Sequence, residues 1–172
     1  MLCVVGNITM TIIRAIVVIL LALSGANAGS LNSYDSVTSW FKDNKSDLNS
    51  LVELLLAHPA IKRVDGELGL KFTTQYDELS KSDLEVYEVV LRESTDLGIK
   101  SAAVSREGSQ KNGDLISVQL LLISKGNVVR GYALTLEYIP DQKYLDMFKS
   151  HGIDYFQLDG ADGWYLAEYV DE

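Results

Sequence analysis

The chain has 172 residues, with 15 Lys and Arg against 24 Asp and Glu, and a formal net charge of −9. This acidity repels phosphate, so it argues against nucleic acid as a partner and disfavours anionic membrane surfaces. The only cysteine, Cys3, lies at the very start of the chain. The remainder therefore cannot form a disulfide scaffold, a thiol enzyme or a thiolate metal site.

Residues 1–28 have the pattern of a cleaved secretory signal peptide. Arg14 precedes nine consecutive apolar residues, Ala15–Leu23, and the segment ends in Ala26-Asn27-Ala28, the small residues that signal peptidase requires. Nine residues are too few to cross a hydrocarbon layer about 30 Å thick. Met10 is an alternative start that would leave the same product.

Removal of this leader would leave residues 29–172 as a single globular domain. The segment contains both prolines of the chain and no Gly/Ser-rich linker, and its length suits one hydrophobic core. We therefore expect a periplasmic or secreted protein with no stable membrane insertion. Retention of the leader as an anchor stays open.

Apolar residues spaced by three, four and seven predict a first helix between Leu31 and Ala57, capped by Ser33 or Asp35. His58-Pro59 should end it, because the residue before proline is pushed out of helical geometry. An Asp65-Gly66 pair between two extended runs then predicts a β-hairpin.

A second helix is expected from Asp83 to Leu97. Ser82 and Glu85 have the spacing of a capping box, and Gly98 is suited to the left-handed conformation that ends many helices. An extended segment, 99–106, and a polar turn, 107–113, should follow.

Two long apolar runs, Leu115–Ser124 and Val128–Ile139, predict an antiparallel hairpin joined at residues 125–127. The first run contains Leu120-Leu121-Leu122-Ile123 without alternation, which favours a central strand covered on both faces.

Pro140 ends this region and precedes a short third helix carrying Tyr144, Leu145 and Phe148, which Gly152 should close. A last hairpin pairs residues 153–158 with residues 164–170. The expected fold class is α+β, an antiparallel sheet of five to seven strands with two to three helices packed mainly on one face.

Catalytic motifs are absent from the sequence. His58 and His151 sit at predicted helix ends, where an imidazolium interacts favourably with the helix dipole, and their spacing does not suit zinc. Asp159–Gly163 has the residues of a tight turn rather than the acid spacing of a calcium loop. We assign no catalytic residue, no metal and no cofactor.

Paired carboxylates are the one catalytic option that the composition leaves open. Glycosidases need two acids across a cleft, and four acids lie near predicted strand ends: Glu137, Asp141, Asp159 and Glu168. Any chain this acidic supplies such pairs by chance.

Aromatic residues concentrate in the last quarter of the chain and give the best candidate for a binding surface. In a strand from Trp164, alternation places Tyr165 and Tyr169 on the face opposite Trp164. We predict binding residues at Tyr155, Trp164, Tyr165 and Tyr169; the alternative is that these rings are core.

The expected function is a non-catalytic binding module of the cell envelope, inhibitor- or immunity-like, whose acidity suits a basic protein partner. The charge is equally compatible with solubility alone. Two alternatives stay open: a carboxylate-dependent glycan hydrolase, and a carrier of a small apolar ligand held between helix and sheet.

Overall fold

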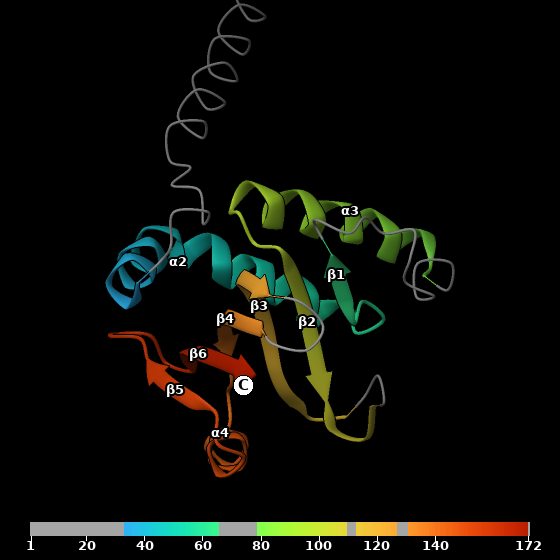
Figure 1. Ribbon diagram of the computed structural model, residues 1–172. Helices are drawn as coiled ribbons and strands as arrows, with labels where there is room; N and C mark the ends of the chain where they lie inside the picture. Colours follow the sequence, from blue (N-terminus) through green and yellow to red (C-terminus); the bar gives the residue numbers. More distant parts are fainter. Residues whose placement is uncertain (1–32, 66–78, 110–112, 127–130, 172) are drawn as a thin grey trace, which may run out of the picture.

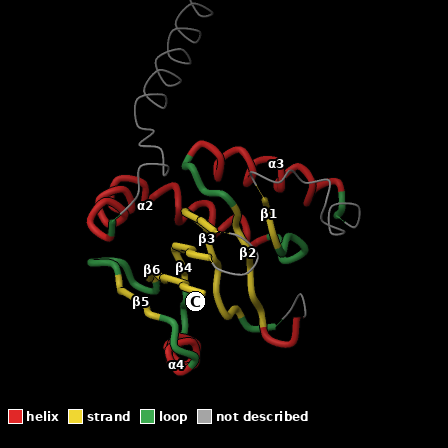
Figure 2. The backbone as a smooth tube through the Cα atoms, in the orientation of Figure 1, coloured by secondary structure: helices red, strands yellow, loops and turns green. Residues whose placement is uncertain are grey.

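The computed structural model describes residues 33–65, 79–109, 113–126 and 131–171. Within these ranges the chain forms three α-helices and one six-stranded antiparallel sheet of order β1-β2-β3-β4-β6-β5, which runs from right to left in Figure 2. The helices are α2 (Tyr34–Ala57), α3 (Lys81–Asp96) and α4 (Gln142–Ser150). The strands are β1 (Arg63–Asp65), β2 (Ser101–Arg106), β3 (Leu115–Gly126), β4 (Gly131–Tyr138), β5 (Asp154–Gln157) and β6 (Trp164–Asp171), with a 3-10 turn, η4 (Glu107–Ser109), between β2 and β3. The predicted α+β class is confirmed.

The sheet separates two apolar clusters. The larger one lies under α2 and α3 and takes alternate residues of the central strands, such as Leu120, Leu136 and Leu166. The smaller one lies on the opposite face and joins α4, through Tyr144 and Leu145, to the sheet. In Figure 1, α2 and α3 run side by side and α4 lies apart from them at the bottom of the view. We call these the main face and the far face.

Helix α2 begins at the predicted cap. The Ser33 hydroxyl accepts a hydrogen bond from the Ser36 amide, and the Ser36 hydroxyl accepts one from the Ser33 amide, which satisfies two free donors of the first turn. His58 ends the helix one residue before Pro59, as predicted. The buried stripe of α2 is almost fully excluded from solvent; Val37, Leu48, Leu51 and Leu55 are each 0 % exposed.

Helix α3 begins two residues earlier than predicted. The N-cap is Ser80, whose hydroxyl accepts a hydrogen bond from the Asp83 amide, so Ser82 and Glu85 lie inside the helix and do not form its cap. Both serines are followed three residues later by an acid, and the spacing alone does not distinguish them. Gly98 has φ 73° and ends the helix as expected.

In the described part of the chain, strand β1 pairs with β2, with Val64 opposite Ala102. The second strand of the hairpin predicted at Asp65-Gly66 falls in residues 66–78, outside the described residues.

Strand β3 lies inside the sheet, between β2 and β4, as the unbroken apolar run predicted. A β-bulge between Leu121 and Ile123 adds one residue to β3, and both Leu122 and Ile123 pack toward the main face. The run therefore contains more main-face residues than alternation allows. β3 also continues to Gly126, so the prediction that residues 125–127 form the turn is wrong for 125 and 126.

The C-terminal elements follow the prediction closely. Helix α4 is capped by Asp141 after Pro140, and β5 and β6 form an antiparallel hairpin. β6 also pairs along its length with β4, which places the hairpin at the edge of the sheet. None of the helices in the described ranges is long and apolar enough to cross a membrane.

Candidate functional site

The four aromatic residues predicted to bind lie on both faces of the sheet. Trp164 is in the main core, 2 % exposed, with its ring 5.5 Å from that of Phe41 and its indole N–H donating to Asn49 Oδ1 at 3.1 Å. Tyr165 is 8 % exposed and belongs to the far-face cluster with α4. The predicted alternation is therefore correct, but these two rings present almost no surface to a partner.

Tyr155 and Tyr169 meet on the far face at a buried carboxylate. Glu137 of β4 is 0 % exposed. The Tyr169 hydroxyl donates to Glu137 Oε1 at 2.6 Å, and the Tyr155 hydroxyl donates to Oε2 at 3.1 Å. Thr135 Oγ1 and Gln119 Nε2 also donate to Oε1, at 3.0 and 3.3 Å. We call these five residues the Glu137 cluster.

The Glu137 cluster holds a carboxylate with neutral donors from the chain itself. A buried carboxylate is tolerated only when hydrogen bonds replace its lost hydration, and here both oxygens receive them. Burial and the Glu137 charge raise the pKa of Tyr169 well above its usual range, and burial and the hydrogen bond with Tyr169 do the same for Tyr155. Both phenols therefore stay protonated as donors. The arrangement joins β3, β4, β5 and β6 and is a structural network.

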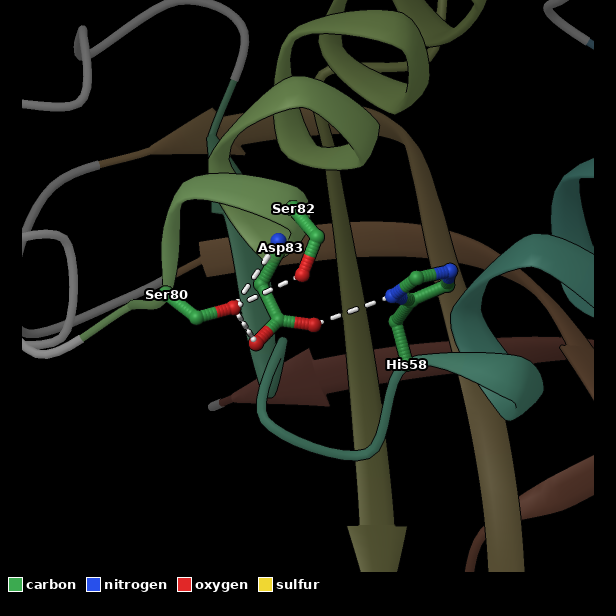
Figure 3. A network of polar contacts seen from close by, with 4 residues as sticks. All are labelled: His58, Ser80, Ser82 and Asp83. Carbon is green, nitrogen blue, oxygen red and sulfur yellow. Dashed lines mark hydrogen bonds and ion pairs between the residues drawn. The ribbon is translucent and has the colours of Figure 1, made fainter.

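A serine, an acid and a histidine also come together where α2 ends and α3 begins. Figure 3 shows Asp83 between its two partners: Oδ1 is 2.9 Å from His58 Nδ1, and Oδ2 accepts from the Ser80 hydroxyl at 2.6 Å. In a nucleophilic triad the imidazole stands between serine and acid, so that it can take the serine proton. Here the acid stands in the middle. The contact caps α3 and ties it to the end of α2.

A polar groove of about 360 Å³ lies between α2 and the turn before β6. Its lining includes Glu53, Asp162 and Lys45, and the Lys45 ammonium donates to the Gly160 carbonyl at 2.7 Å. Trp164 also lines this groove. With two acids and one lysine, the lining carries a small excess of negative charge.

A second groove, of about 270 Å³, opens where α2 begins above the main face of β4, β6 and β5. Its walls are mostly apolar, from Tyr34, Phe156, Leu134 and Leu166. Tyr34 and Phe156 are 42 % and 46 % exposed, with ring centroids 5.8 Å apart in an edge-to-face arrangement. We call it the aromatic groove. Large apolar rings exposed together on a chain of this size are typical of interaction sites.

One wall of the aromatic groove carries a carboxylate. Glu168 and Tyr132 line it together with the apolar residues. Burial, and to a smaller extent the Glu168 charge, raise the pKa of Tyr132. The ion pairs between described residues join other acids, and none includes Glu168.

No family model, no curated protein and no solved structure matches this chain. Over the described ranges, His, Cys, Asp and Glu side chains form no group of three or more that could hold a metal ion. The candidate site is therefore defined by geometry alone, and the two grooves are open features of the described part of the chain.

Sequence reasoning did not select Tyr34, Phe156 or Glu168 as a group. Tyr34 had the helical spacing of a core residue, Phe156 was one of many C-terminal rings, and Glu168 was one of several acids near strand ends. Tyr34 lies 122 residues before Phe156 in the numbering, so only the fold brings the three together. Alternation along β6 places Glu168 on the same face as Leu166, which was the one available signal.

Proposed function

We propose that this chain is a non-catalytic binding module of the cell envelope or extracellular space, inhibitor- or immunity-like, that binds a basic protein partner. The observation that carries the proposal is the aromatic groove, in which exposed Tyr34 and Phe156 stand beside Glu168, a carboxylate that joins no ion pair between described residues. Aromatic anchors and an acid of this kind give a partner both buried apolar area and charge complementarity.

The charge of the whole chain supports the same partner. A net charge of −9 attracts a basic protein at long range and accelerates its encounter. The Glu137 cluster argues indirectly against the hydrolase alternative, because four side chains of the chain itself already donate hydrogen bonds to this buried acid.

The proposal is tested by capture from an envelope extract. The chain is expressed with its own leader and a C-terminal tag, and the exported product is incubated with extract at low and at moderate salt. Captured proteins are identified by mass spectrometry and then reconstituted with the purified chain. The expected result is a basic protein that binds in a defined stoichiometry and is released by salt, because screening weakens charged encounters.

Variants make this capture specific to the groove. Phe156→Ala removes an exposed ring, and we expect it to abolish or strongly weaken capture. Glu88→Gln is the control: it changes an exposed acid on α3 and leaves the groove intact, so capture should persist. Empty capture at both salts, or capture that Phe156→Ala does not affect, would overturn the proposal.

A carrier of a small apolar ligand is the second candidate. It is favoured by the position of the aromatic groove between the start of α2 and the sheet, and by the leucines in its walls. A neutral dye such as N-phenyl-1-naphthylamine tests it by its fluorescence increase on entering an apolar site. Saturable binding of the dye that Phe156→Ala removes, together with empty capture, would favour the carrier over the protein-binding module.

A further inference from the structure

The aromatic groove has two chemically different parts. Rings and aliphatic side chains form most of its lining, and the Glu168 carboxylate stands among them. This carboxylate is exposed, and no cation of the described residues forms an ion pair with it. The groove is therefore complementary to a ligand with an apolar body and a positive end.

Long cationic side chains have this composition. Arginine and lysine carry an apolar stem that packs along hydrophobic surface while the charged head reaches a polar partner. A groove of about 270 Å³ is at the small end of ligand sites, and this size suits one side chain rather than an extended cofactor.

Arginine fits the lining better than lysine. Its planar guanidinium stacks on aromatic faces and pairs with a carboxylate through two parallel hydrogen bonds. The groove offers exposed rings at Tyr34 and Phe156 and one carboxylate at Glu168. Lysine could make the ion pair but not the stacked, two-pronged contact.

We propose that the aromatic groove is an anchor site for an arginine side chain of the partner, with the stem along the exposed rings of Tyr34 and Phe156 and the guanidinium on Glu168. This inference rests on the proposed function, because it names the residue by which a basic partner is held. It also makes the recognition local: one side chain, rather than the net charge alone, determines binding.

The experiment uses a small probe, so that no partner is needed. Purified, isotopically labelled chain is titrated with N-acetyl-arginine methylamide and followed by NMR shifts of backbone amides. The matched probes are the citrulline derivative, which has nearly the same shape without charge, and the norleucine derivative, which has only the stem. We expect the arginine probe to bind in the millimolar range and at least about tenfold more tightly than citrulline.

Two variants locate the binding. Glu168→Gln removes the charge and little else, and it should lower affinity for the arginine probe about tenfold while leaving citrulline binding unchanged. Glu88→Gln should leave both affinities unchanged. Spectra of Glu168→Gln that overlay with those of the parent chain outside the groove exclude a folding defect.

Three results would overturn the anchor site: equal affinity for arginine and citrulline probes, an unchanged arginine affinity in Glu168→Gln, or shifts that map outside the groove. If the captured partner is retained by Glu168→Gln and the probe gives no shifts, the anchor site fails and the binding module stands. If the probe binds at the groove and capture is empty, the binding module fails and the arginine site stands.

Discussion

Two glutamates on neighbouring strands meet opposite surroundings. Glu137, on β4, is fully buried on the far face and accepts hydrogen bonds from four side chains of the chain itself. Glu168, on β6, is exposed on the main face at the aromatic groove and joins none of the ion pairs between described residues. One carboxylate is part of the structural network, and the other is the one that we propose a partner binds.

The difference comes from the face of the sheet on which each residue lies. Glu137 is opposite Tyr165 and Glu168 is opposite Leu134, so the two acids lie on strands that pair directly but point to opposite sides. On the far face tyrosines and a threonine supply donors. On the main face, near the sheet edge, Glu168 lies opposite Leu134 on one side and Asp154 on the other, and no hydrogen bond between described residues reaches its carboxylate. Residue type alone therefore does not distinguish a structural acid from a binding acid.

The largest expected effect concerns Glu137. Glu137→Leu keeps a side chain of similar size but leaves the donors of Tyr155, Tyr169, Thr135 and Gln119 without their acceptor. We expect a loss of about 2–4 kcal/mol in the free energy of unfolding, measured by urea denaturation, because stranded polar groups keep their desolvation cost. A variant as stable as the parent chain would show that the Glu137 cluster is not a structural network.

Most of the fold could be predicted from local pattern. The first and last helices, the central strand and the β5–β6 hairpin all follow from spacing, proline positions and turn residues within short windows. The errors lie where two local solutions compete. Ser80 and Ser82 are equally good caps by sequence, and the backbone adopts the extended cap conformation at Ser80, with φ −65° and ψ 162°. The β3 bulge similarly depends on pairing with β4.

The candidate site could be predicted only in part. Alternation correctly separated Trp164 from Tyr165 and Tyr169, because it is a property of one strand. It could not show that Tyr34, at the start of the first helix, approaches Phe156 near the end of the chain. It also could not show that four side chains, from β3, β4, β5 and β6, donate hydrogen bonds to Glu137. Such contacts depend on strand order, which short windows do not contain.

The next effect distinguishes the two tyrosines of the Glu137 cluster. Tyr169 donates to the carboxylate at 2.6 Å and Tyr155 at 3.1 Å. We expect Tyr169→Phe to lose about 2 kcal/mol of stability and Tyr155→Phe about 1 kcal/mol, since the shorter of two hydrogen bonds to the same carboxylate is the stronger. Urea denaturation of both variants measures the ranking, and the reverse order would contradict the assigned geometry.

Alkaline pH tests the same two phenols without mutation. Their pKa values are raised in the folded state, by burial first. Above about pH 10 the unfolded chain loses these protons while the folded chain keeps them, so stability should fall as pH rises, by up to about 1.4 kcal/mol per pH unit for each tyrosine. Below pH 10 the two phenols should contribute no slope.

The control for this titration is the double variant Tyr155→Phe/Tyr169→Phe. It should show a flatter dependence of unfolding free energy on pH between 10 and 11 than the parent chain, because the two phenols no longer release protons on unfolding. Absorbance at 295 nm follows the phenolates directly. Equal slopes in the parent chain and the double variant would mean that both phenols ionise normally in the folded protein.

The smallest effect has the opposite sign and belongs to Glu168. Removing its charge leaves no hydrogen-bond donor of the described residues unpaired and reduces repulsion within an acidic chain. We therefore expect Glu168→Gln to be as stable as the parent chain or more stable by up to about 0.5 kcal/mol. Urea denaturation beside the Glu88→Gln control separates a local effect from the loss of one unit of net charge. A destabilisation above about 1 kcal/mol would give Glu168 a structural role like that of Glu137. If Glu168→Gln is as stable as the parent chain or more stable, and also binds the arginine probe more weakly, then Glu168 contributes to binding and not to the stability of the fold.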